Sequence, residues 1–135
     1  MEQAEIGWVA GILDGEGYIG LASAGKYQAR PRIDLVNNDE SILIRYQNDL
    51  KDIGIASRIH HTERVFRVIL SGKNDIACLL SIVGRYLTGW KIDRARLVLE
   101  CCKLDGKSPG RLKRKEILSE YNRKYRRNSL TNNPE

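Results

Sequence analysis

The chain contains 135 residues, of which 41% are hydrophobic and 30% are charged. This length fits one domain with a sizeable core, and this composition excludes collagen-like and wholly disordered proteins. No apolar run approaches the ~20 residues that a membrane span requires, and the acidic start, with Glu2 and Glu5, lacks the features of a secretory signal or a transit peptide. We therefore expect an intracellular protein that is not secreted, located in the cytoplasm or, if its gene is organellar, in the organelle.

The net charge of +6 is distributed unevenly along the chain. Residues 1–105 contain 14 basic and 14 acidic side chains, whereas residues 106–135 contain 9 and 3. The basic tail, together with arginines in the expected strands, favours a polyanionic partner. The cysteines are odd in number and lack the spacing of metal ligands, which favours buried reduced thiols. They are Cys78, Cys101 and Cys102.

The first expected helix covers residues 4–14 and carries two different stripes. The apolar stripe, at helical spacing, consists of Ile6, Val9, Ala10 and Leu13. A second stripe consists of Gly7, Gly11 and Gly15, and each glycine inside a helix costs about 1 kcal/mol. Close approach of another backbone would offset that cost. A weak helix that frays toward a glycine C-cap is the alternative.

The remaining patterns predict an α+β fold with four antiparallel strands. Strands are expected from residue 18 to a turn near 24–26, and over 28–36, 55–60 and 65–71. Further helices are expected from an N-cap at Asp39 to Gly54, and over about 74–87 and 91–104. After a linker at 108–110, residues 112–127 form either one more amphipathic helix that contacts phosphates or a solvated charged tail, and 128–135 look disordered.

One face of this expected sheet packs on the helices, and the opposite face is exposed and basic. Strand alternation assigns eight positions to the exposed face: Gln28, Arg30, Arg32, Asp34, Arg58, His60, Arg67 and Ile69. A β-ribbon of this kind can enter the major groove of DNA, where arginine can bond guanine through two donors. His60 and His61 point to opposite faces, so joint metal ligation is not expected.

Two carboxylates, Asp14 and Glu16, end the glycine-striped helix, where the helix dipole disfavours negative charge. Mg²⁺ commonly binds one or two carboxylates together with phosphate oxygens in phosphoryl chemistry. Alone, such a pair is weak evidence, because exposed acidic pairs are common.

The whole string from Val9 to Gly17, VAGILDGEG, resembles the nine-residue motif that names the LAGLIDADG homing endonuclease family. The resemblance covers roughly residues 6–104 and implies the family's αββαββα core with a four-stranded saddle. Three positions depart from the name: Val9 replaces Leu, Gly15 replaces Ala and Glu16 replaces Asp. Glutamate keeps the charge and adds a methylene, so the geometry around a metal could shift slightly.

The resemblance implies roles for particular residues. Glu16 would be the metal-binding acid at the scissile phosphates, with the carbonyl of Gly15 also reaching a metal, which would be Mg²⁺ or another divalent cation such as Mn²⁺. Asn37, favoured over Asn38 by strand parity, would help to hold the attacking water. Lys91 would polarise that water or stabilise charge on the phosphate; an ordinary first-turn lysine is the alternative.

A single motif supplies one active site, whereas cutting both strands of a duplex needs two. The resemblance therefore implies a homodimer, paired through Gly7, Gly11, Asp14 and Gly15, that hydrolyses phosphodiesters on a long, near-palindromic duplex. Residues 1–105 would form the endonuclease domain and 106–135 a basic, partly disordered extension. No membrane and no small-molecule cofactor is expected. The alternatives are a protein of the same fold that binds nucleic acid without cleavage, such as a maturase-like splicing factor or a transcription regulator, and a basic structural or ribosome-associated module.

Overall fold

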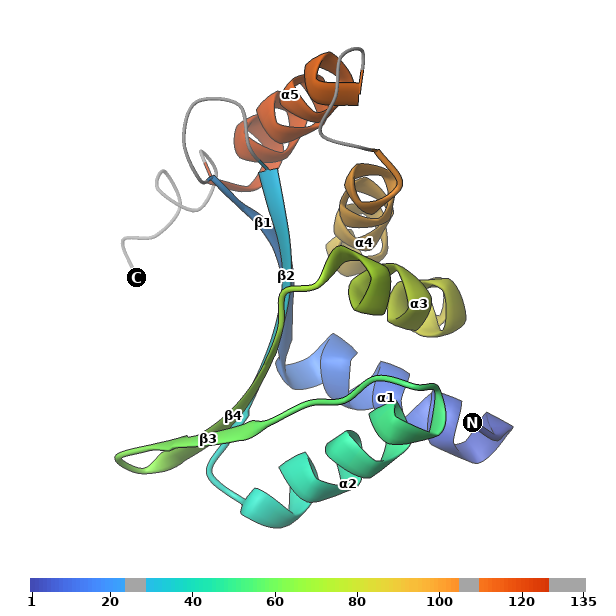
Figure 1. Cartoon of the computed structure of the whole chain (residues 1–135), viewed down its shortest axis with the longest axis vertical. Coiled ribbons are helices and arrows are strands. Elements are labelled where there is room, and N and C mark those ends of the chain that lie inside the picture. Colours follow the sequence, from blue (N-terminus) through green and yellow to red (C-terminus); the bar gives the residue numbers. More distant parts are fainter. Residues whose placement is uncertain (24–28, 105–109, 127–135) are drawn as a thin grey trace.

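The computed structural model describes residues 1–23, 29–104 and 110–126, and it shows the expected α+β fold (Figure 1). Gln28, the turn near residue 25, residues 108–109 and the end of the chain from residue 127 lie outside the described residues. The strands are β1 (Gly17–Ser23), β2 (Ala29–Asn37), β3 (Ile59–Thr62) and β4 (Val65–Leu70). The helices are α1 (Gln3–Glu16), α2 (Glu40–Asp52), α3 (Lys73–Val83), α4 (Trp90–Cys102) and α5 (Gly110–Tyr121), with short helical turns η1 (Gly84–Tyr86) and η2 (Asn122–Arg126).

The strands form one antiparallel sheet in the order β1-β2-β4-β3. Pairing between β2 and β4 begins at Ile33, so Pro31, which cannot donate a hydrogen bond, lies where β2 is paired with β1 alone among the described strands. The sheet is strongly curved, and the β3–β4 hairpin bends away from the helices (Figure 1). One face is therefore left open as a concave surface.

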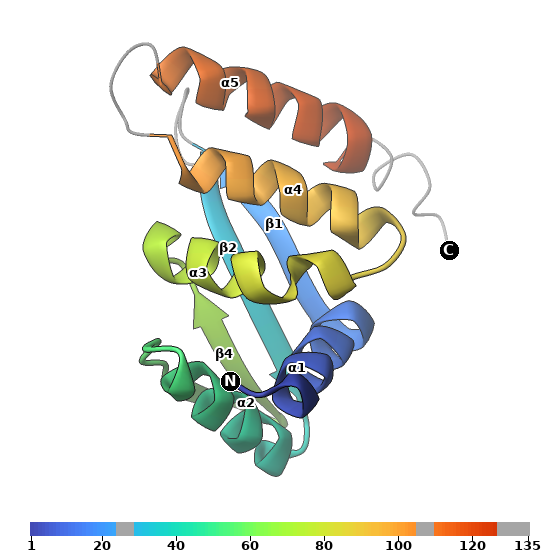
Figure 2. The same ribbon diagram turned by 90° about the vertical axis from the view of Figure 1, so that its right-hand side faces the viewer.

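The helices α1 to α4 lie on the opposite face of the sheet and enclose the core with it (Figures 1 and 2). Alternate strand residues such as Ile19, Ile33 and Val68 are fully buried against them. The period-two and period-3.6 patterns therefore identified the core faces correctly. Within the described residues, no helix is long and apolar enough to cross a membrane.

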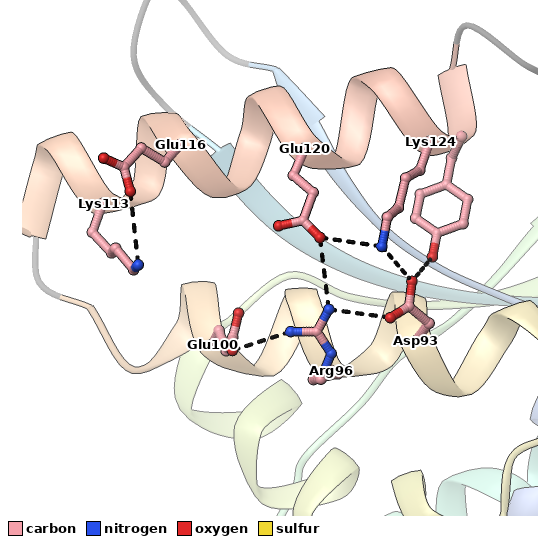
Figure 3. A network of polar contacts seen from close by, with 8 residues as sticks. Asp93, Arg96, Glu100, Lys113, Glu116, Glu120 and Lys124 are labelled. Carbon is pink, nitrogen blue, oxygen red and sulfur yellow. Dashed lines mark hydrogen bonds and ion pairs between the residues drawn. The ribbon is translucent and has the colours of Figure 1, made fainter.

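The basic C-terminal segment forms a helix that lies alongside α4 (Figure 2). Its apolar side buries Ile117, Leu118 and Tyr121. Helix α5 and the following turn η2 form a network of ion pairs with α4, in which Lys124 of η2 and Arg96 of α4 contact acidic groups of α4 and α5 (Figure 3). Exposed ion pairs contribute little singly, so the buried side chains are the main attachment.

Two expectations need correction. The third strand begins at Ile59 and not at Ile55, because residues 55–58 are bound to α2: Ile55 N donates to Leu50 O at 3.0 Å and Gln47 Nε2 donates to Ser57 O at 2.7 Å. Arg58 therefore precedes the strand, although its side chain is exposed. Cys78 is exposed, whereas Cys101 and Cys102 are buried, and burial raises the pKa of Cys102 to about 12.

Candidate active site and nucleic-acid interface

Glu16 is the last residue of α1, and its exposed carboxylate stands where the helix meets the sheet. Helix α1 ends there because Gly17 turns into β1; a Cβ on Gly17 would lie 2.7–2.9 Å from atoms of Leu13, so only glycine fits without a shift. The amide of Asn37 donates from Nδ2 to Glu16 Oε2 at 2.5 Å. The acid of the motif is thus fixed by a residue from the end of β2.

Asn37, and not its neighbour Asn38, is the residue beside Glu16. By strand alternation, the side chain of Asn37 lies on the helix-covered face of the sheet, where Asn37 is paired with Phe66 of β4. Its Oδ1 accepts a hydrogen bond from Asp39 N at 2.8 Å, which leaves Nδ2 directed at the carboxylate. Asp39 in turn caps α2 by accepting from Ser41 N at 3.0 Å. The orientation of the amide is therefore set by the turn that starts α2.

Lys91 binds the end of α1 through its ammonium group. Nζ donates to three backbone carbonyls, those of Leu13 at 2.9 Å, Asp14 at 2.6 Å and Gly17 at 2.8 Å. An ammonium has three donors, so this conformation leaves none for a water or a phosphate. The positive charge also complements the negative end of the helix dipole. Burial lowers the pKa of Lys91, although the charge of Asp14 opposes this shift.

Asp14 caps the segment that precedes α4. Its two carboxylate oxygens accept hydrogen bonds from Thr88 N at 2.9 Å and Thr88 Oγ1 at 2.6 Å. These two bonds hold the pKa of Asp14 below its usual range. Together, the contacts of Asp14 and Lys91 attach the residues on both sides of Glu16 to Thr88 and to the start of α4.

The glycine stripe of α1 faces open space. A Cβ built on Gly7, Gly11 or Gly15 meets no atom of the described chain within 4 Å. The described part of the chain therefore provides no packing reason for the three glycines.

Six expected DNA-facing residues share the open face of the sheet. The register aligns Asp34 with Ile69 across β2 and β4, and His60 with Arg67 across β3 and β4. By alternation Arg30 and Arg32 project to the same side. His61 projects to the other side, where its ring stacks on Phe66 with centroids 4.3 Å apart. The two histidines of this hairpin therefore project to opposite faces of the sheet.

Asp34 lies on the inner strand β2 and forms ion pairs with two arginines. Its carboxylate is 3.1 Å from Nη2 of Arg32 and 3.2 Å from Nε of Arg67. The Asp34 side chain is only 10% exposed, whereas those of Arg32 and Arg67 are 41% and 37% exposed. A buried carboxylate thus forms ion pairs with two guanidinium groups that still face solvent, and it accepts a hydrogen bond from Arg32 but not from Arg67 Nε.

The sequence did not single out a cluster of aromatic side chains around Arg94. The guanidinium carbon lies 4.9–5.3 Å from the ring centroids of Tyr18, Trp90, Tyr121 and Tyr125. Tyr121 also accepts a hydrogen bond from Arg94 Nε at 3.2 Å. Cation–π contacts of this kind attach the C-terminal segment to α4 and to β1. Gly20, two residues after Tyr18 on the same face of β1, was the signal that the sequence offered for this cluster. A Cβ on Gly20 would overlap the hydroxyls of Tyr18 and Tyr121.

A family model for the LAGLIDADG-like domain matches residues 3–84, which is more than half of the chain. The chain belongs to the LAGLIDADG family. The match begins with α1 and ends in η1, so it includes Glu16 and Asn37 but not Lys91. No curated protein sequence is significantly similar to this LAGLIDADG chain.

Solved structures of homing endonucleases share the fold of this LAGLIDADG protein. The homing endonuclease I-CvuI, solved with the I-CreI target in the presence of magnesium and with the DNA not cleaved, superimposes with a TM-score of 0.73 at 21% identity, over 88% of this chain and 80% of that one. An archaeal intron-encoded homing endonuclease, I-Vdi141I, complexed with DNA, has a TM-score of 0.73 at 15% identity, over 91% and 85%. The homing endonuclease I-TnaI has a TM-score of 0.70 at 16% identity, over 87% of each chain.

Proposed function

We propose that this LAGLIDADG protein is a site-specific, metal-dependent DNA endonuclease that acts as a homodimer on a long, near-palindromic duplex. The observation that carries the proposal is the construction around Glu16. An exposed acid is held by Asn37 at the end of a helix whose terminus is fixed by Lys91. This solvent-facing carboxylate has no hydrogen-bond partner besides that amide among the described residues.

The groups around Glu16 suit a hard divalent cation. The Glu16 carboxylate and the Gly15 carbonyl offer oxygen ligands, which Mg²⁺ and Mn²⁺ prefer, and Glu16 is exposed enough for the substrate phosphate to complete the shell. When bound, the metal would supply a more acidic water and neutralise charge that develops on the phosphate. Asn37 would keep Glu16 in one orientation for this task.

In this proposal Lys91 is a positioning residue. The sequence suggested that it contacts the reacting water or phosphate. Its three bonds to carbonyls of α1 and Gly17 support a different contribution, the placement of Glu16 and the Gly15 carbonyl relative to the sheet. Placement errors of about 1 Å can lower an enzymatic rate by two orders of magnitude.

Homodimer formation is supported by the open glycine stripe. Gly7, Gly11 and Gly15 leave a side-chain-free surface along α1 that nothing in the described chain fills. A second copy of α1 could approach it closely and would bring a second Glu16 near the first, where shared metals would offset their repulsion. Two such sites would allow both DNA strands to be cut.

The exposed sheet face would read the DNA. Asp34 restrains Arg32 and Arg67, which lowers the conformational entropy that these long side chains lose on binding. We therefore assign to Asp34 the orientation of two arginines toward base edges. Arg30 and His60 would extend the contact surface on either side.

The test is cleavage of a randomised duplex library by the purified protein with and without Mg²⁺. The recovered site then serves as substrate for Glu16→Gln, with Glu40→Gln on the exposed start of α2 as the matched control. We expect Glu16→Gln to lower the single-turnover rate by at least about 10³-fold while DNA affinity changes little, and the control to cut normally. DNA that is bound but never cut would replace this proposal with nucleic-acid binding by the same fold without cleavage.

A further inference from the structure

A second group of carboxylates lies at the other end of α1, where its first turn meets the last turn of α2. Glu5 from α1 and Asp49 and Asp52 from α2 each place one carboxylate oxygen within 4.8 Å of the others. Asp49 and Asp52 are three residues apart, so they share one face of α2. Glu16, at the far end of α1, is not part of this group.

Asp49 is the member of the group that the protein alone leaves unsatisfied. The residue is only 6% exposed, and its Oδ2 atom is shielded from solvent and accepts no hydrogen bond. A buried carboxylate oxygen without a hydrogen-bond partner is unfavourable, and a cation between the three carboxylates would satisfy it.

Within the described part of the chain, no basic side chain forms an ion pair with Asp49. Arg45 is the nearby basic residue that favours the charged form of Asp49, but its guanidinium stacks on the Trp8 ring at 4.1 Å from the centroid. Asp49 and Asp52 also stand at the negative end of the α2 dipole, where further negative charge is disfavoured. The three carboxylates therefore form a negatively charged group of hard oxygen donors.

We propose that Glu5, Asp49 and Asp52 bind a hard divalent cation, of the calcium or magnesium class, that links the start of α1 to the end of α2. Oxygens within 4.8 Å of one another can be bridged by Ca²⁺, whose bonds to oxygen are about 2.3–2.6 Å long, whereas Mg²⁺ with bonds of about 2.0–2.1 Å would need the group to close. Water would complete the shell on the exposed side of Asp52.

The contribution of this site is structural and does not depend on nuclease activity. Glu5 already accepts a hydrogen bond from the backbone of Glu2 at 2.8 Å, so an ion at Glu5 would also hold the first turn of α1. With three protein carboxylates, the affinity should be weak, with Kd on the order of 0.1–1 mM.

The experiment is thermal unfolding of the full chain without DNA, in CaCl₂ or MgCl₂ up to about tenfold above the expected Kd and in NaCl of matched ionic strength. We expect Ca²⁺ to raise the Tm by about 4–6 °C, more than Mg²⁺ does. Because each variant is compared with itself with and without metal, changes in its intrinsic stability do not enter the result.

Asp49→Asn and Asp52→Asn should each abolish the rise, whereas Glu16→Gln should keep it. Asp52 is exposed, so Asp52→Asn remains informative if Asp49→Asn fails to fold. The proposal is overturned if the wild-type chain shows no rise, if both aspartate variants keep it, or if only Glu16→Gln loses it. An Asp49→Asn chain that is stabilised without metal, in a protein that ignores Ca²⁺, would show that a proton occupies the group.

Discussion

Replacing Lys91 with methionine should loosen the end of α1 and, with it, the position of Glu16. Methionine keeps the length and the apolar stem of the side chain but removes three hydrogen bonds, to the carbonyls of Leu13, Asp14 and Gly17. Hydrogen bonds to charged groups contribute about 1.5–3 kcal/mol each. Water would reach part of the released helix end, and the free-energy cost of desolvating the ammonium would disappear. The sum of the three hydrogen bonds therefore overstates the loss of stability.

We expect Lys91→Met to lower the free energy of unfolding by about 3 kcal/mol and the Tm by about 10 °C. Lys91→Arg should recover little of this stability, because a planar guanidinium cannot converge on three carbonyls as an ammonium does. Lys103→Met, at the exposed end of α4, is the matched control and should change the Tm little. Urea and thermal unfolding followed by circular dichroism measure the three variants.

Single-turnover cleavage of the recovered site separates positioning from direct chemistry. A positioning residue predicts that Lys91→Met and Lys91→Arg lose rate together, because both misplace Glu16. If Lys91→Met unfolds within about 2 °C of the wild type while cleavage disappears, or if Lys91→Arg cuts normally despite lost stability, the assignment of Lys91 to positioning is wrong.

Four further changes test other parts of the structure. Asn37→Ala should lower the cleavage rate about 10–100-fold with little change in DNA affinity, since outer-shell partners typically contribute this much; a normal single-turnover rate would refute the role of Asn37. Gly11→Leu has room in the monomer and should improve helix propensity by up to about 1 kcal/mol, yet size-exclusion chromatography should show loss of the dimer, whereas Gly84→Leu, also in open space, should remain dimeric. The pKa of Asp93 is held at about 2 by its bond from Tyr125 and by the Arg96 and Lys124 partners, so its contribution is present above about pH 4 and is lost as the pH falls toward 2. In urea unfolding, the free energy of unfolding of the wild type should therefore fall by about 1 kcal/mol more between pH 6 and pH 3 than that of Asp93→Asn does. This figure is reduced because the Asp93 side chain is 37% exposed. Asp34→Asn should relax discrimination among single-base variants of the site in a binding competition, and an unchanged base preference would contradict its orienting role.

The repetitive parts of the fold were predictable from local sequence. Alternation in β2 placed Ile33 and Leu35 on the core face and Arg32 and Asp34 on the opposite face, and the structure agrees, although Asp34 is buried there and not exposed as expected. Asp39 caps α2 as its residue type suggested. The prediction for β2 succeeds because a strand with one buried face has only one acceptable register.

Side-chain partners from distant segments were not predictable. Nothing near Lys91 in sequence indicates that its ammonium reaches α1, 74 to 78 residues away. The β3 boundary failed because Gln47 binds the backbone of Ser57 and removes that segment from the ladder. Local patterns describe which face a residue is on, and tertiary hydrogen bonds decide what it touches there.

The ion pairs of Asp34 affect how DNA binding would respond to salt. An arginine that neutralises a phosphate releases counterions, and each such contact adds about −0.9 to the slope of log K against log salt concentration. Arg32 and Arg67 already share a carboxylate, so in reaching base edges they would displace few condensed ions. The affinity contributed by these two side chains should therefore persist at ionic strengths that weaken the phosphate contacts.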